Sequence, residues 1–106
     1  SNARPDRTEP ATENLLPGNP LSLTSGSSIV TVIEPAHGRS TNNTVVFRNV
    51  DGSPGGLVFS LFENSSGFSI TVVDTNSYSF NCGSNATVTE KSGGMFVTAG
   101  PVTLTP

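Results

Sequence analysis

The sequence predicts an all-β protein, and three observations lead to that prediction. Short runs rich in Val, Ile, Phe and Thr recur between clusters of Gly, Asn, Asp and Ser, which is the pattern of strands joined by turns. Charged residues make up 12% of the 106 residues, against about 25% in ordinary globular domains, and small polar residues, Gly and Pro replace them. The segment Phe68 to Val72 alternates apolar and hydroxyl side chains with a period of two, as a half-buried strand does.

The expected strands follow one another at regular spacing. Asp74-Thr75-Asn76 lies between two of them, and such residues bond to their own backbone and tolerate positive φ, so we expect a hairpin there. The signals for the last two strands are weaker. The expected strands are Ser28 to Ile33, Thr44 to Asn49, Leu57 to Phe62, Gly67 to Val73, Ser77 to Phe80, Ala86 to Glu90, Met95 to Thr98 and Val102 to Thr105.

Two of these strands do not alternate, which bears on the architecture. Val45-Val46 and Leu57-Val58-Phe59 place apolar side chains on both faces of a strand, as happens when a small sheet curls on itself or lies under a loop. We therefore predict a small antiparallel β-barrel. The alternative is an immunoglobulin-like β-sandwich.

The amino-terminal residues differ in composition from the rest of the chain. Ser1-Asn2-Ala3 is typical of the remnant of a cleaved affinity tag, so we expect the natural sequence to begin at Arg4. Residues 4–20 contain four prolines and five of the thirteen Asp, Glu, Lys and Arg residues, which predicts an extended arm or linker. Residues 21–106 are then a single β-barrel domain.

Composition argues against several classes of function. The net charge of −3 offers no basic stripe to a nucleic acid, and no apolar run reaches the roughly 18 residues of a membrane span. With one Cys and one His the chain cannot form an internal disulfide or a zinc site of its own. The carboxylates of Asp51, Glu63, Asp74 and Glu90 lack the D-x-D spacing of a calcium loop and are interpreted as solvated turn charges. We expect no metal, no cofactor and no small-molecule ligand.

Two other features have plain structural explanations. Residues 52–56 are glycine-rich but lack the Lys-Ser/Thr of a phosphate loop, so they are interpreted as a flexible loop. Cys82 has no Lys, Arg or His beside it in sequence to favour the thiolate, which indicates a half-buried thiol rather than a nucleophile.

His37 is the residue that most resembles a catalytic group. A hydrolase triad would need a serine at a nucleophile elbow, and the chain has no G-x-S-x-G motif. Glu34 to Gly38 instead has the composition of a strand end followed by a turn. We therefore predict that the His37 ring bonds to backbone groups and holds a turn, in preference to a catalytic or metal-binding role.

Two segments resemble a repeat of bacteriophage tail and virion structural proteins. Ser27 to Val32 together with Pro35 to Phe47 is similar to the pattern S-x-V-V-T-V-T-x-x-x-H-G-L-S-T-G-D-x-V-x-F, and Phe68 to Phe80 is similar to Y-x-V-T-x-V-D-A-N-T-Y-T-F. The resemblance extends over about Asn19 to Pro106. A weaker similarity, to a β-barrel insertion of ubiquitin-activating enzymes, implies no ligase chemistry.

The chain departs from the repeat at two places in the first segment. Arg39 stands where the repeat has Leu, which puts part of the loop packing in question, and Asn42-Asn43 stands where it has Gly-Asp. Asn is the non-glycine residue that best tolerates positive φ, so the turn is expected to survive. The residues expected to build the turns are His37, Gly38, Asn42, Asn43, Asp74 and Asn76.

The resemblance implies a non-enzymatic structural or assembly module of a phage tail or related virion protein, located in the virion. Its partners would be proteins, either neighbouring domains or other virion proteins, and the isolated chain would be a monomer or a weak oligomer. The alternative is an immunoglobulin-like domain of a bacterial surface adhesin or glycan-binding protein. A hydrolase using His37 is disfavoured.

Overall fold

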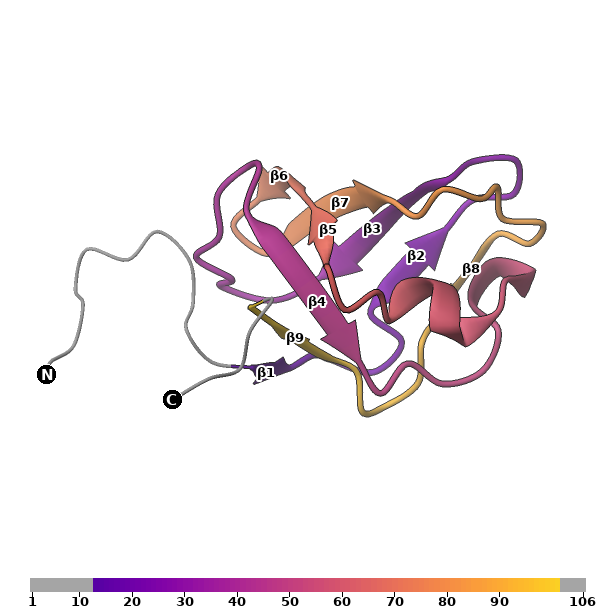
Figure 1. The fold of residues 1–106 in the computed structure, drawn as a ribbon, viewed down its shortest axis with the longest axis horizontal. Coiled ribbons are helices and arrows are strands. Elements are labelled where there is room, and N and C mark those ends of the chain that lie inside the picture. Colours follow the sequence, from indigo (N-terminus) through magenta and orange to yellow (C-terminus); the bar gives the residue numbers. More distant parts are fainter. Residues whose placement is uncertain (1–12, 102–106) are drawn as a thin grey trace, which may run out of the picture.

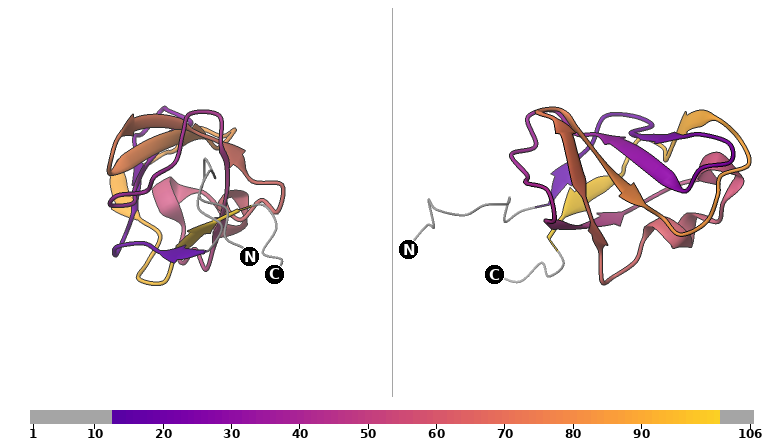
Figure 2. Two further views of the ribbon diagram at one scale, coloured as in Figure 1. Left: turned by 90° about the vertical axis from the view of Figure 1, so that its left-hand side faces the viewer. Right: turned by 90° about the horizontal axis from the view of Figure 1, so that it is seen from above.

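In the computed structural model, which describes residues 13–101, the chain folds into two antiparallel sheets with two short 3-10 helices (Figure 1). Seen along the long axis, β6 and β7 cross the top of the molecule while β1 and β9 lie at the bottom (Figure 2). The prediction of an all-β protein is confirmed.

The smaller sheet has the strand order β1-β9-β4-β5. Its strands are β1 (Asn14–Leu15), β9 (Thr98–Gly100), β4 (Thr44–Arg48) and β5 (Phe68–Ser69). The first and the last strand are therefore neighbours: Asn14 faces Ala99 and Leu15 faces Thr98.

The larger sheet has the order β6-β7-β3-β2-β8. Its strands are β6 (Thr71–Asp74), β7 (Ser77–Asn81), β3 (Ile29–Ile33), β2 (Leu21–Leu23) and β8 (Glu90–Ser92). Its longest ladder joins β3 to β7 over five residue pairs, from Ile29 opposite Asn81 to Ile33 opposite Ser77. Period-two burial places Val30 and Val32 of β3 in the core.

The expected strand from Gly67 to Val73 is divided between the two sheets. Phe68–Ser69 pairs with β4, Thr71–Asp74 pairs with β7, and buried Ile70 lies at the step between them. The Ile70 amide donates to the carbonyl of Asn43 (3.0 Å), and its carbonyl accepts from the amide of Asn42 (2.8 Å). The chain thus crosses between sheets while the peptide groups at the step stay hydrogen-bonded.

The predicted closed barrel is corrected to a sandwich-like pair of sheets. Over the described residues, each sheet keeps two edges: β1 and β5 in one, β6 and β8 in the other. One reason is that the expected strand from Leu57 to Phe62 does not form. That segment contains the 3-10 helix η2 (Phe59–Phe62), preceded by η1 (Pro54–Gly56), so it supplies no strand to close the sheets.

The core fills the space between the sheets. Phe47 of β4 stacks on Phe80 of β7 with 5.2 Å between ring centroids, and Phe68 packs on Phe80 at 4.4 Å. Tyr78 continues the cluster 6.4 Å from Phe47. These aromatic pairs join strands of both sheets, so the sheets are held together mainly by the area they bury.

The folded part begins before residue 21, where we expected an arm to end. β1 pairs with β9, Leu16 is buried, and the Leu16 amide donates to the carbonyl of Val97 (2.8 Å). The prolines had suggested a linker, but Pro20 is itself buried and its carbonyl accepts from the Ile33 amide (3.0 Å). Residues 1–12, with the expected tag remnant, and the expected strand at 102–105 lie outside the described residues.

Two further strand boundaries differ from those expected. Ala86 forms a single bridge to Ser25, and the strand in that region is β8, which starts at Glu90. The strand expected from Met95 lies at Thr98–Gly100, because Met95 and Phe96 belong to an exposed loop.

Candidate functional site

The turn that follows β3 rests against the hairpin between β6 and β7. The backbone amides of Glu34 and His37 donate to the carbonyls of Asn76 (2.9 Å) and Thr75 (3.2 Å). The Ala36 amide donates to Oδ1 of Asn76 (2.9 Å). Ala36 and Gly38 both have positive φ, 52° and 65°, so the chain reverses sharply around His37.

The His37 ring is buried, and both of its nitrogens contact backbone groups. Nδ1 accepts from the Arg39 amide (2.8 Å), so Nε2, which lies 2.7 Å from the carbonyl oxygen of Asp74, carries the ring proton and donates. The edge of the ring meets Tyr78 at a centroid distance of 5.2 Å. Neither nitrogen is free to act as a general base in this arrangement.

Asp74 and Asn76 shape the hairpin from their side chains. Oδ1 of Asp74 accepts from the Asn76 amide and from the hydroxyl of Ser77, both at 2.8 Å. The bond from the Asn76 amide, followed by that from Ser77, lowers the pKa of the Asp74 carboxyl below its ordinary value. Asp74 therefore stays ionised while it holds the turn.

Asn42 and Asn43 have different roles in the second turn. Asn42 has a φ of 77°, as its place in the pattern suggests, whereas Asn43 accepts from the Ser40 amide through Oδ1 (2.8 Å). Thr41 Oγ1 accepts from the Val72 amide (2.9 Å). Four of the six predicted turn residues thus lie in two neighbouring turns that are bonded to the segment between Ile70 and Asn76, and the other two, Asp74 and Asn76, form the hairpin within that segment.

Arg39 is the residue whose role the sequence did not indicate. Its side chain is fully buried, and its Nε atom forms an ion pair with Oε1 of Glu34 at 2.9 Å. Nη2 donates to Oε2 of Glu34 and to the carbonyl of Ala99, both at 3.3 Å. Where the resembling repeat has Leu, this chain fills the space with a buried ion pair that links the turn to β9.

Two further side chains complete the surroundings of Glu34. The Tyr78 hydroxyl donates to Oε1 (2.6 Å), and Asn14 Nδ2 donates to Oε2 (3.1 Å). Burial, followed by the negative charge and hydrogen bond of Glu34, raises the pKa of Tyr78 well above its ordinary range. Arg39 Nη1 is buried and has no hydrogen-bond partner among the described residues.

A depression of about 570 Å³ opens beside this network. Its lining includes Ala36, His37, Val72, Asp74 and Thr75, and it is mainly apolar. Two polar groups at its wall hold the turns: the His37 ring bonds to backbone, and Asp74 bonds to Asn76 and Ser77. Arg39 also lines the depression, and its Nη1 is the buried atom without a partner among the described residues.

The remaining carboxylates and the cysteine contact backbone groups. Glu63 accepts from the Val50 amide (2.8 Å) and Glu90 from the Gly55 amide (2.7 Å). These two half-buried carboxylates therefore differ from the solvated turn charges that the sequence predicts. The Asp51 side chain accepts from the Gly52 amide (2.9 Å). The thiol of Cys82 is buried and donates to the carbonyl of Ser84 (3.2 Å).

Two further features are absent from the part of the chain that the structure describes. Between residues 13 and 101, no three or more His, Cys, Asp or Glu side chains gather in a way that would hold a metal ion. Over the same residues, no helix has the length and apolar character needed to cross a membrane.

Comparison with known proteins shows a similarity of fold and no similarity of sequence family. No family model matches the chain, and no curated protein matches its sequence. Among solved structures, the chain is similar to the phage phi92 endosialidase, with a TM-score of 0.66 and 19% sequence identity. The similarity covers 92% of this chain but 14% of that protein, so the chain spans a small part of its length. At this identity the similarity shows a shared fold.

Proposed function

We propose that this chain is a non-enzymatic structural module of a phage tail or related virion protein, located in the virion. The observation that carries the proposal is the similarity of nearly the whole chain to part of a phage protein. The activity that the name of that protein states belongs to the whole of it, and this chain spans 14% of its length. The shared fold supports the phage context. Whether the chain has an activity depends on the state of its own polar side chains.

The two segments that resemble the phage repeat also form one structural unit. The first contains β3, the His37 turn and β4, and the second contains the β6–β7 hairpin on which that turn rests. β3 and β7 are joined by the longest ladder of the fold. The resemblance therefore falls on segments that contact one another, as expected if it reflects a common architecture.

The non-enzymatic part of the proposal rests on the state of the polar groups. Both nitrogens of His37 are bonded to backbone, and Glu34 is neutralised by Arg39 within the core. Cys82 is buried, and its thiol bonds to a carbonyl. A catalytic site needs groups free to exchange protons or bonds with a substrate, and these side chains are occupied in maintaining the fold.

The phage assignment is tested by purifying virions from the source of the gene and identifying their proteins by mass spectrometry. We expect peptides of this chain in the virion and tail genes flanking its reading frame. Flanking genes for a cell-wall-anchored surface protein, with no such peptides in virions, would refute the proposal. Hydrolysis of sialosides by the isolated chain would refute its non-enzymatic part alone.

A bacterial adhesin domain is the second candidate, because two open antiparallel sheets are also the architecture expected for it. The fold does not separate the two candidates, because part of the phage protein shares it. A glycan array decides the matter. Specific, saturable binding of one glycan class would favour the adhesin, whereas the structural module is expected to bind none.

A further inference from the structure

The chain enters and leaves the described fold at the same point. β1, the first strand, lies at the edge of its sheet and pairs with β9, the last strand, in an antiparallel manner. The start of β1 therefore faces the end of β9. A Cβ atom added to Gly100 would lie 3.3 Å from the Cα atom of Glu13, so the incoming and outgoing backbones are in contact.

This arrangement decides how tension in a longer polypeptide would act on the fold. Force applied before Glu13 and after Gly100 separates the two strands from their shared end, so the β1–β9 bonds are loaded one after another. In a strand pulled along its own axis against a neighbour, by contrast, the ladder bonds share the load. Peeling two residues of β1 from β9 requires far fewer bonds to break at once than shearing the five-pair ladder of β3 and β7.

The contacts that oppose peeling at this point are few. Glu13 contacts the Thr98 hydroxyl and lies 3.5 Å from Arg48 in a partly exposed ion pair, a kind that contributes little to stability. Behind it, Asn14 donates to Glu34 and the Leu16 amide bonds to Val97. Loss of β1 would thus remove one partner of the buried Glu34–Arg39 pair, so the first step of peeling weakens the core.

We propose that this domain is a side branch of its parent polypeptide and not a link that transmits tension. This rests on the proposed function, in which the chain is one module of a longer tail protein. The preceding and following parts of that protein would meet at the edge formed by β1 and β9. The η1 and η2 helices and the loop between β7 and β8 lie toward the other end of the molecule (Figure 1) and would be presented away from the parent. Such a module would be attached to its parent at one point and would not be linked end to end with its neighbours.

Single-molecule force measurements on the full chain test the proposal. In a Cys82→Ala background, handles at the two termini load the β1–β9 end. Handles at Ser28→Cys and Thr75→Cys pull β3 and β7 in opposite directions along their axes, because these positions flank opposite ends of that ladder. A second shear variant, Ile29→Cys with Thr75→Cys, places both handles at exposed positions at opposite ends of the same ladder and serves if Ser28→Cys impairs folding.

We expect the unfolding force to be lower with handles at the termini than with either shear pair. Unfolding through the termini should release the contour length of the whole described fold. A force through the termini equal to or above that of the shear pairs would overturn the proposal. The result is independent of the virion test, because it measures this chain alone. A chain that is mechanically weak yet absent from virions would refute the proposed function without altering its mechanical geometry.

Discussion

The two ends of the molecule close the same core by opposite means. Where β3 turns toward β4, the interior contains the charged and polar side chains of Glu34, Arg39 and Tyr78, joined by short hydrogen bonds. Toward the other end, near η1 and η2, it contains Phe62, which is fully buried, and the backbone of Gly55, against which Leu23 packs. The first end relies on matched polar partners and the second on matched volume.

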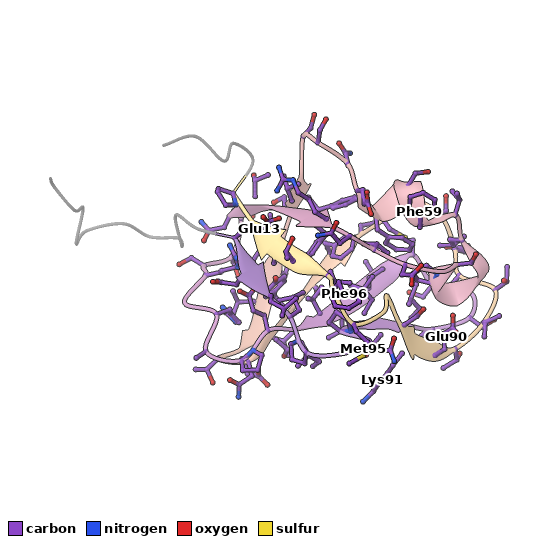
Figure 3. The ribbon with its side chains drawn as sticks, turned by 90° about the horizontal axis from the view of Figure 1, so that it is seen from below. Glu13, Phe59, Glu90, Lys91, Met95 and Phe96 are labelled. Atoms are coloured by element: carbon purple, nitrogen blue, oxygen red, sulfur yellow. The ribbon has the colours of Figure 1, made fainter. Side chains whose placement is uncertain are left out.

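This difference determines which changes each end tolerates. Removal of one partner at the polar end leaves a charge buried in a medium of low dielectric constant. At the apolar end, added volume displaces atoms that are already in contact. The surface between the two ends provides a reference: Met95 and Phe96 are exposed there (Figure 3), so changes to them should cost little stability.

The largest effect is expected from Arg39→Leu, which introduces the residue of the resembling repeat. Glu34 would then be buried without its cation, so we expect the free energy of unfolding to fall by about 3 to 5 kcal/mol. Urea denaturation measures it. The double variant Arg39→Leu with Glu34→Gln removes the stranded charge and should recover part of the loss. A single variant as stable as the native chain would show that the pair contributes nothing.

A pair of glycine substitutions separates backbone strain from crowding. Gly38 and Gly55 have nearly the same φ, 65° and 63°, but a Cβ on Gly38 meets nothing within 4 Å, while one on Gly55 lies 2.7 Å from Cδ2 of Leu23. Gly38→Ala should cost about 1 to 2 kcal/mol from strain. Gly55→Ala should cost about 1 to 3 kcal/mol more. Equal losses by chemical denaturation would contradict the contrast between the two ends.

Gly38→Val extends that series at the polar end. A β-branched residue at positive φ is more strained than Ala, so we expect a larger loss than for Gly38→Ala although the surrounding space is open. Thermal unfolding of the two variants side by side measures the difference. A Val variant as stable as the Ala variant would mean that the turn relaxes to another conformation.

His37→Ala removes the ring that joins its own turn to the β6–β7 hairpin. The backbone amide of Arg39 and the carbonyl of Asp74 would lose their partner, and we expect a loss of about 1 to 2 kcal/mol in stability. His37→Phe, which keeps an aromatic ring beside Tyr78 but no ring nitrogens, is the matched control and should recover packing only. An unchanged melting temperature in the Ala variant would show that the ring is idle.

The smallest change in stability at neutral pH is expected from the proton of Tyr78, and this change becomes larger in alkaline solution. Its pKa is raised in the folded state, so the folded chain keeps a proton that the unfolded chain releases near pH 10. The corresponding stability is fully present below pH 10 and is lost as the pH rises further. Because Tyr78 is the only tyrosine, ultraviolet absorbance reports its ionisation alone. We expect ionisation to coincide with unfolding; a separate ionisation of the folded chain near pH 10 would contradict the buried contact with Glu34.

Much of the central hairpin architecture was predictable because its signals are local. The alternation in Phe68 to Val72 and in Ser77 to Phe80 reports which side faces the core, and the structure buries Ile70, Tyr78 and Phe80 accordingly. The positive φ values of Gly38 and Asn42 follow from residue types that adopt them at least cost. A two-residue strand such as β1 is too short to show any period, so its sequence predicts part of an arm and not a strand.

Other features depended on contacts that no local pattern contains. An apolar run such as Leu57-Val58-Phe59 is compatible with a strand or a helix, and packing resolved it as the approach to η2, with Phe62 fully buried. Carboxylates at turns suggested solvation, yet Glu63 and Glu90 each accept from a backbone amide of another segment.

The fold class, the central hairpin and the places where the backbone must turn follow from local signals, because residue preferences and period-two patterning act over a few neighbouring positions. The open sheets, the pairing of the first described strand with the last and the burial of Arg39 depend on contacts between distant segments. The partners of that network, Asn14, Glu34 and Tyr78, are up to 64 residues apart in sequence. A buried charge is stable only where the whole fold brings its partners within hydrogen-bond distance.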